Sequence, residues 1–281
     1  MDMMNRTKYI LALLAIMIGF SIVAQGINSP SVMMDVMMNV RMLRQAKKGN
    51  LVFLDNVCRT DNGLYILSTA DQAYLLGVGG IGAISQKDNK KINSFALVDG
   101  LLYSVRGREL CYLDTMARFV TYKKLPHYNM KIYNGTNGIY LTGSTKTRRG
   151  ESIYVIRKSD DAFIRLIDVP TSVSAVTEYG PLIIFATMNS IYGLDTSSKK
   201  VFKMVELPNK KEHIMSLIYD KLNDYIYFSS KKGIYRIDEK GINCLNNTVG
   251  GVLCYDPDGL VVFNVEKKEM YRLRNSILLP K

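Results

Sequence analysis

One strand–turn–strand pattern recurs six times along the chain, and this repeat restricts the possible folds more than any other sequence feature. Each copy starts at a turn and runs into a β-rich stretch; the copies are Asn62–Thr69, Asp99–Gly107, Asn137–Ser144, Tyr179–Thr187, Asn223–Ser230 and Asp258–Val265. A second stretch centred on one tyrosine follows each copy, and these tyrosines are Tyr74, Tyr112, Tyr154, Tyr192, Tyr235 and Tyr271. Their spacing of roughly 36 to 43 residues is that of one four-stranded propeller blade. The repeat therefore predicts an all-β fold, a six-bladed β-propeller of four-stranded antiparallel blades.

The remaining strands are expected on either side of these pairs. An inner strand precedes each turn, and a short outer strand follows the tyrosine stretch, as at Arg118–Pro126, Ala162–Pro170 and Val201–Pro208. A proline at the end of an outer strand costs no ladder hydrogen bond because the strand lies at an exposed edge. No sustained helical period follows Lys48, so a parallel α/β fold, which needs crossover helices, is disfavoured. A β-sandwich fits the near-constant period less well.

The first 24 residues have the pattern of an export signal. Arg6 and Lys8 precede an uncharged apolar run, Tyr9–Ala24, that ends in small residues. A cleaved signal peptide is favoured over a retained N-terminal anchor, because the run is slightly short for a membrane span. Both interpretations predict a periplasmic or extracellular location. The predicted organisation is a signal or anchor at 1–24, a Met-rich leader at 25–50 and the propeller at 51–281.

Two features near the ends of the propeller leave alternatives open. In the leader, an apolar stripe recurs at helical spacing and is formed by Met33, Val36, Met37, Val40 and Leu43. Such a stripe either packs on its own domain or forms an adaptable binding surface. The outer strand of the last blade could come from the final residues, 276–281, or from the N-terminal segment.

The four cysteines, Cys58, Cys111, Cys244 and Cys254, lack the paired spacing of a zinc site. Cys244 and Cys254 fall on successive predicted strands and could pair in an oxidising compartment. The alternative is that all four are small buried apolar residues.

The formal net charge is +12, which indicates attraction to polyanions. The repeat assigns many cations to the face that carries the turns between second and third strands and the connections between blades, most clearly Lys146, Arg148 and Arg149 in an extended loop of the third blade. The same face is assigned Lys90, Arg106, Arg108, Lys231 and neighbouring lysines. Asp residues gather on the opposite face, where turn geometry alone explains many of them. The candidate ligand-binding residues are Lys146, Arg148, Arg149, His127, Lys210, Lys211 and His213.

Little in the sequence points to catalysis. The two histidines, His127 and His213, each follow an outer strand, which places both in connections between blades on one face. They could serve as a base or as metal ligands, or be ordinary surface histidines. No Ser-His-Asp set or Gly-x-Ser-x-Gly turn is recognisable. The sequence thus names no catalytic residue and no metal ligand.

Two stretches, Asp220–Gly241 and Tyr255–Leu273, resemble blades of known six-bladed propellers. The chain is similar to the TolB-like, strictosidine-synthase-like and gluconolactonase-like group, including exported propellers of Bacteroidetes-type bacteria. This group includes both hydrolases and binding scaffolds, so the resemblance implies a fold and leaves the activity open. Its lactonase-type members hold calcium over the central channel, which makes Asn129, Glu178 and Asp220 candidate oxygen ligands here.

These observations favour a binding or scaffolding propeller outside the cytoplasm over an enzyme. Its expected partner is a protein or an anionic glycan or envelope component, engaged through the basic face. The alternative is a divalent-cation-dependent hydrolase of the lactonase type, with its site at the central channel. Nucleic acid is the least favoured partner, because export removes the chain from it and no aromatic–basic track is visible. No cofactor is predicted apart from calcium in the hydrolase alternative.

Overall fold

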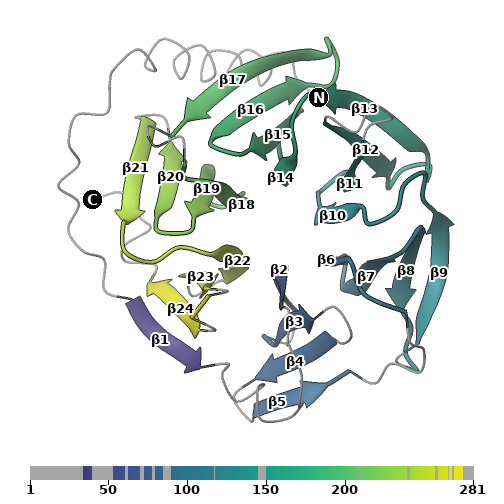
Figure 1. Cartoon of the computed structure of the whole chain (residues 1–281), viewed down its shortest axis with the longest axis horizontal. Helices are drawn as coiled ribbons and strands as arrows, with labels where there is room; N and C mark the ends of the chain where they lie inside the picture. The colour runs from purple at the N-terminus through teal and green to yellow at the C-terminus, as the bar shows by residue number, and fades with distance from the viewer. Residues whose placement is uncertain are drawn as a thin grey trace.

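The computed structural model arranges six antiparallel four-stranded sheets in a ring, which confirms the predicted six-bladed propeller (Figure 1). It describes residues 34–39, 53–60, 63–69, 73–77, 80–84, 90–116, 118–144, 150–207, 209, 211–238, 241–256, 259–264, 266–267 and 269–274. All regular elements within these ranges are strands. No helix in the described part of the chain is long and apolar enough to cross a bilayer. The predicted signal at 1–24 lies outside the described residues.

Each blade is a meander whose first strand lies at the channel and whose last strand lies at the rim (Figure 1). Blade one contains β2 (Phe53–Arg59), β3 (Tyr65–Thr69), β4 (Ala73–Gly77) and β5 (Gly80–Ala83), and blade two contains β6 (Ser94–Val98), β7 (Leu101–Arg106), β8 (Glu109–Leu113) and β9 (Phe119–Lys124). Blade three contains β10 (Lys131–Asn134), β11 (Gly138–Ser144), β12 (Glu151–Arg157) and β13 (Phe163–Val169), and blade four contains β14 (Val173–Tyr179), β15 (Leu182–Thr187), β16 (Ser190–Asp195) and β17 (Lys200–Glu206). Blade five contains β18 (Ile214–Asp220), β19 (Tyr225–Ser230), β20 (Ile234–Asp238) and β21 (Gly241–Asn246). Blade six contains β22 (Val252–Asp256), β23 (Gly259–Asn264), β24 (Glu269–Arg274) and β1 (Met34–Asn39).

The repeated Asn/Asp-Gly turns join the first two strands of several blades. Between β6 and β7, Asp99 and Gly100 both have positive φ, 48° and 78°, and the flanking residues Val98 and Leu101 are paired. A two-residue hairpin loop needs this left-handed backbone at both positions, because only then does its twist match that of the strands. The turn residues in the repeat are therefore selected by backbone geometry.

The six repeated tyrosines lie on the third strand of each blade, as predicted. In three blades the ring stacks on a phenylalanine of an adjacent strand: Tyr192 on Phe185 at 5.4 Å, Tyr235 on Phe228 at 4.8 Å and Tyr154 on Phe163 at 5.2 Å between ring centroids. Cross-strand aromatic pairs of this kind stabilise a sheet. The tyrosine repeat is thus explained by packing.

Apolar side chains fill the interfaces between neighbouring blades. Each of the six clusters of buried apolar residues in the described part of the chain joins two adjacent blades. Between blades one and six, for example, Leu67 and Leu76 pack with Val261 and Phe263. The hydrophobic core therefore consists of six apolar interfaces between neighbouring blades, arranged around the central channel.

The ring is closed by the N-terminal segment. β1 pairs antiparallel with β24, with Met34 opposite Leu273 and Asn39 opposite Glu269, and so completes blade six. The helical spacing noted in the leader is not realised here, because Met34–Asn39 is an extended strand with a register shift after Val36. β1 lies within 25–50, so the propeller includes a strand from the predicted leader. Residues 276–281, the other candidate for closure, lie outside the described residues.

A buried polar network also joins the last blade to the first. The carboxylate of Asp256, 1% exposed, accepts hydrogen bonds from Tyr65 and Arg272 (3.0 Å for Arg272) and lies 3.3 Å from Arg59 Nε. Tyr65 and Arg59 belong to blade one, whereas Asp256 and Arg272 belong to blade six. Removing such a carboxylate would leave two guanidinium groups without their counter-charge in a partly buried site.

Replacing residues 34–39 with a Gly/Ser linker of the same length is expected to lower Tm by about 10 °C. The replacement removes the strand that covers β24, and a loss of about 3 kcal/mol shifts the Tm of a domain of this size by about 2–4 °C per kcal/mol. Thermal denaturation followed by circular dichroism measures the effect. An unchanged Tm would show that β1 is not needed to close the ring.

Tyr65 is expected to make stability depend on pH in the alkaline range. Burial, together with the hydrogen bond to Asp256, raises the pKa of Tyr65 to about 12 from its usual value of 10.0. The unfolded phenol therefore ionises first, and the stability that Tyr65 contributes is present below pH 10 and lost as the pH rises towards 12. Urea denaturation at several pH values should show a shallower alkaline decline in Tyr65→Phe than in the wild type. The exposed Tyr128→Phe is the control, and equal slopes for all three proteins would contradict this role.

Candidate functional site

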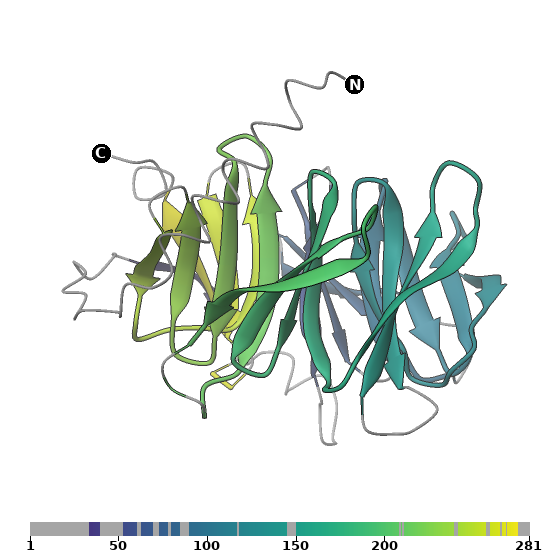
Figure 2. The same ribbon diagram turned by 90° about the horizontal axis from the view of Figure 1, so that it is seen from above.

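The meander order gives the disc two distinct loop faces, seen edge-on in Figure 2. We call the face with the turns between second and third strands and the connections between blades the basic loop face. The opposite face, with the first-to-second and third-to-fourth turns, is the hairpin face. This assignment agrees with the one expected from the repeat.

The structure describes three of the seven predicted ligand-binding residues. His127 lies in the β9–β10 connection, whereas Lys211 and His213 lie in the β17–β18 connection, so all three are on the basic loop face. These connections are separated by two blades, and no described contact joins them. The other four, Lys146, Arg148, Arg149 and Lys210, lie outside the described residues.

The two histidines differ in their surroundings. His127 is half-buried, with its Nε2 3.0 Å from the hydroxyl of Tyr154 and the two ring centroids 6.0 Å apart. It therefore packs between blades two and three. His213 is exposed at the start of β18. The separation of the two residues gives no support to a shared metal or a joint acid–base role.

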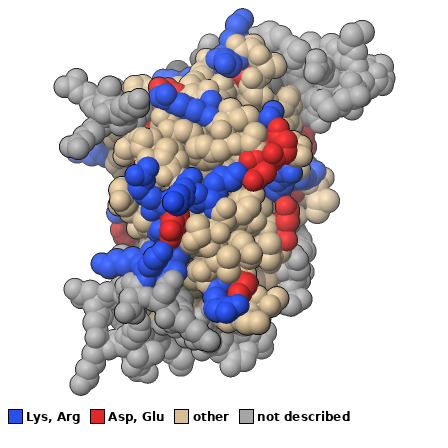
Figure 3. Space-filling model, turned by 90° about the vertical axis from the view of Figure 1, so that its right-hand side faces the viewer, with Lys and Arg blue, Asp and Glu red and all other residues tan. Residues whose placement is uncertain are grey.

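Many cations on the basic loop face have no acidic partner in the part of the chain that the structure describes. Lys90 pairs with Glu109 at 2.7 Å, and Lys231 pairs with Glu266 at 2.8 Å. Six exposed residues of this face make no salt bridge with any described residue: Lys91, Arg108, Lys124, Lys131, Lys211 and Lys267. Positive charge is thus left available to a partner. On the side of the ring that contains β9 and β13, by contrast, Lys and Arg side chains are interspersed with Asp and Glu (Figure 3), and Lys123 and Arg165 pair there with Asp161 and Asp168.

Arg106 corrects the sequence-based picture of this face. It was expected among the exposed cations but is 2% exposed, with its guanidinium 4.7 Å from the ring centroid of Phe119 and a hydrogen bond to the carbonyl of Lys90. The planar guanidinium can stack on a ring and still donate hydrogen bonds, so Arg106 serves the fold.

The acidic residues of the hairpin face serve their own turns. Asp114 accepts hydrogen bonds from the backbone of Met116 and Arg118, and Asp160 accepts one from Ala162. Hydrogen bonds from Ser197 and Ser198 lower the pKa of Asp195 to about 2. These are the local side-chain-to-backbone bonds for which Asp is favoured in turns. The predicted geometric reason for this acidic face is therefore confirmed at these turns.

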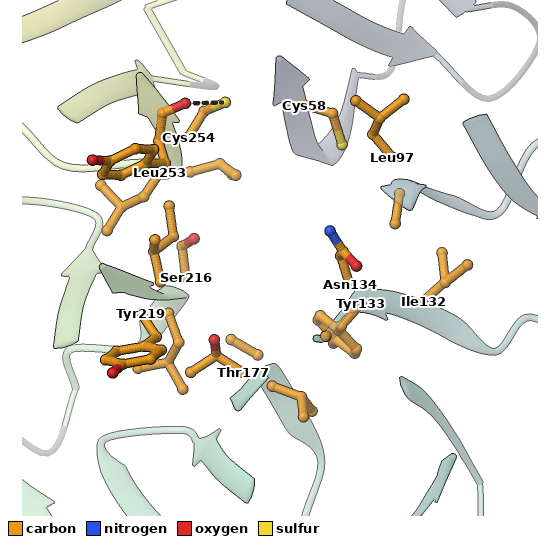
Figure 4. A pocket seen from close by; sticks show the side chains of 18 of the residues that line it. Cys58, Leu97, Ile132, Tyr133, Asn134, Thr177, Ser216, Tyr219, Leu253 and Cys254 are labelled. Atoms are coloured by element: carbon orange, nitrogen blue, oxygen red, sulfur yellow. Dashed lines mark hydrogen bonds between the residues drawn. The ribbon is translucent and has the colours of Figure 1, made fainter. Parts of the chain in front are cut away.

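The central channel contains a cavity of about 940 Å³ lined by all six inner strands (Figure 4). Tyr133, Thr177 and Ser216 line the channel from blades three, four and five. Cys58 and Cys254 line it where blades one and six meet (Figure 4). At the hairpin face, Lys158 of blade three pairs with Asp99 of blade two at 2.9 Å, which bridges two blades at the mouth. The channel is large enough for a small polar ligand.

The described channel residues do not form an activated nucleophile. All four cysteines are free thiols, and burial raises the pKa of Cys58 to about 12 and that of Cys254 well above its usual value. Both therefore stay protonated at neutral pH, where a thiol is a poor nucleophile. The alternative disulfide between Cys244 and Cys254 is not formed, because Cys244 is on the outer strand of blade five and Cys254 on the inner strand of blade six.

The candidate calcium ligands do not come together. Glu178 accepts hydrogen bonds from Tyr140 (2.6 Å) and from the backbone and side-chain amides of Asn137 (2.9 and 3.2 Å). Asp220 caps its own turn by accepting bonds from Leu222 and Asn223. Asn129 lies on the opposite, basic loop face. Among the described residues, no group of three or more His, Cys, Asp or Glu could hold a metal ion. These residues do not fit a calcium site.

The network around Asp256 and the exposed Tyr128 were not predicted from the sequence. A signal for the first was present, because the inner strands of blades five and six both end in Tyr-Asp, at Asp220 and Asp256. The partners Arg59 and Tyr65 come from the far end of the chain, which no local pattern reveals. Tyr128 stands outside the repeat and has no signal of its own.

No protein-family model and no curated protein matches the chain. Solved structures do match. The extracellular domain of a protein assigned as a hybrid two-component system of B. thetaiotaomicron aligns with a TM-score of 0.57 at 11% identity, over 83% of this chain and 32% of that one. A protein assigned as a gluconolactonase aligns with a TM-score of 0.60 at 12% identity, over 81% of this chain and 90% of that one. Hydrazine synthase of Kuenenia stuttgartiensis aligns with a TM-score of 0.60 at 13% identity, over 79% and 83%.

These proteins share a fold with the chain and differ widely in what their names describe. At identities of 11–13% the likeness establishes the propeller architecture only. The chain spans about a third of the length of the extracellular domain that it matches.

Replacing Glu178 with Gln is expected to destabilise the protein without changing its response to calcium. The carboxylate satisfies three donors, and an amide would turn a donor towards them, at a cost of about 1–3 kcal/mol. Urea denaturation measures the loss, with the exposed Glu266→Gln as a matched control. Melts with calcium and with chelator should agree within about 1 °C in the wild type. If calcium instead raised the Tm of the wild type by several degrees and Glu178→Gln abolished this rise, a calcium site at Glu178 would be supported.

Proposed function

We propose that this chain is an exported binding propeller that engages an anionic partner through its basic loop face. The observation that carries the proposal is the set of exposed cations on that face without salt bridges. On the hairpin face, Arg118, Arg157 and Lys158 each pair with an Asp, and the exposed Lys199, Lys200 and Lys221, which make no salt bridge with a described residue, lie among the acidic residues of its turns. An excess of positive charge on one face raises the rate at which an anionic partner is captured.

Export is supported by two features. The N-terminal sequence has a basic start followed by an apolar run that ends in small residues, which is typical of a signal peptide. One structural neighbour is described as an extracellular domain. A periplasmic or extracellular location is therefore part of the proposal.

A binding role is favoured over hydrolysis by the state of the channel groups. Glu178 and Asp220 are engaged by their own chain, and the buried thiols of Cys58 and Cys254 stay protonated. The calcium-dependent hydrolase remains the second candidate, and the Glu178→Gln experiment tests it.

Removing charge from the basic loop face should weaken binding to a polyanion more than the same change on the hairpin face. In the test variant Lys91, Lys211 and Lys267 are replaced with Gln, and in the control Lys199, Lys200 and Lys221 are replaced. Three exposed charges at about 0.5 kcal/mol each predict about a tenfold rise in Kd for the test variant. Retention on an immobilised polycarboxylate at graded salt compares the two. Equal weakening would contradict a polarised surface and leave only the net charge.

A further inference from the structure

Tyr128 is the most exposed aromatic residue in the described part of the chain, with 69% of its surface accessible. It lies in the β9–β10 connection, on the basic loop face where blade two meets blade three. The guanidinium of Arg108 lies 5.4 Å from the centroid of its ring. Both residues are exposed, so neither contributes to the core and both are accessible to a partner.

The backbone around Tyr128 is held in place from two sides. Leu125 N donates to the Arg108 carbonyl at 2.8 Å, and Asn129 N donates to the Gly107 carbonyl at 3.1 Å. Arg108 Nε donates back to the Leu125 carbonyl at 3.2 Å. The turn at Gly107 is in turn fixed by its N–H bond to Asn93 Oδ1 at 2.7 Å. A surface built this way loses little entropy when a partner binds.

Lysines flank Tyr128 along the chain and in the neighbouring connection. Lys124 ends β9 directly before the connection, and Lys131 begins β10 directly after it. Lys91 belongs to the adjacent connection, which Arg106 fixes by donating to the carbonyl of Lys90. Glu109 directly follows Arg108 at the start of β8, and its carboxylate already pairs with Lys90 at 2.7 Å. The charge left for a partner is therefore positive.

We propose that Lys91, Arg108, Lys124, Tyr128 and Lys131, together the Tyr128 platform, form the hot spot where the basic loop face docks an acidic protein segment. This inference rests on the proposed function and names the partner class. Tyr and Arg are enriched among the residues that dominate protein interfaces, and the flanking lysines would select carboxylates on either side of an apolar contact on Tyr128. The segment would thus carry Asp or Glu on both sides of an aromatic or aliphatic side chain.

The platform lies beside the channel and outside it. Lys131 contributes to the lining of the channel cavity, whereas Arg108 and Tyr128 do not. A partner on the platform would therefore reach the rim of the channel mouth through Lys131 and leave the cavity itself open to a second ligand.

The test uses the full chain and a fluorescent twelve-residue peptide of Glu with one central Phe. A second peptide has Ala in place of Phe, and polygalacturonate supplies the same carboxylates on a glycan. Tyr128→Ala is expected to raise the Kd of the Phe peptide about tenfold and that of the Ala peptide much less, because the two side chains contact each other. Lys124→Gln with Lys131→Gln should weaken both peptides equally and reduce the salt dependence.

The controls are Leu222→Ala, which removes an 82% exposed apolar side chain from the hairpin face, and Lys200→Gln, which removes an exposed charge there. Both should bind like the wild type. Equal Kd values for Tyr128→Ala and the wild type would overturn the platform, and tighter binding of polygalacturonate through the same residues would overturn the protein partner. If the platform fails while Lys91, Lys211 and Lys267 still control retention on the polycarboxylate, the proposed function survives without this hot spot.

Discussion

The structure depends on sheets that bury apolar residues on both faces and therefore need a neighbour on each side. A single four-stranded blade cannot satisfy that requirement, and neither can an open row, whose end blades would each expose one face. The contact between blades one and six is consequently the one on which all others rely. It combines strand pairing between β1 and β24, an apolar cluster, and the carboxylate of Asp256 shared by tyrosine and arginine side chains of both blades.

Most of the fold could be predicted because its repeated features are local. Hairpin turns such as Asp99-Gly100 need left-handed backbone, and third-strand tyrosines such as Tyr192 stack on a neighbouring aromatic residue. The tyrosine recurs in all six repeats and the Asn/Asp-Gly pair in four of them, so both leave a signal in the sequence. The closing strand could not be identified in this way, because β1 has no repeat unit of its own and its apolar residues also fit a helical spacing. Pairing with β24, more than two hundred residues away, decided the outcome.

The candidate site was less predictable for the same reason. Loop topology followed from the strand order, so the face of His127, Lys211 and His213 could be assigned from sequence. Exposure could not, and Arg106 is buried over Phe119 although its sequence position suggested a surface charge. Tyr128 was missed because a functional surface on a propeller lies in residues that depart from the repeat, and a single departure cannot be recognised in one sequence. The Asp residues of the hairpin face could be predicted, because many of them recur in turns and hydrogen-bond within those turns.

The pairing of β1 with β24 also fixes an order of assembly. β1 can pair only after β24 has been synthesised, more than two hundred residues later in the chain, so blades one to five can form before the sixth is complete. Until then the chain has an open seam with one unpaired sheet edge and two uncovered apolar faces. Such an intermediate is prone to pair with another chain. Pairing of β1 with β24, rather than formation of any single blade, is thus the event that closes the ring and covers its last apolar interface.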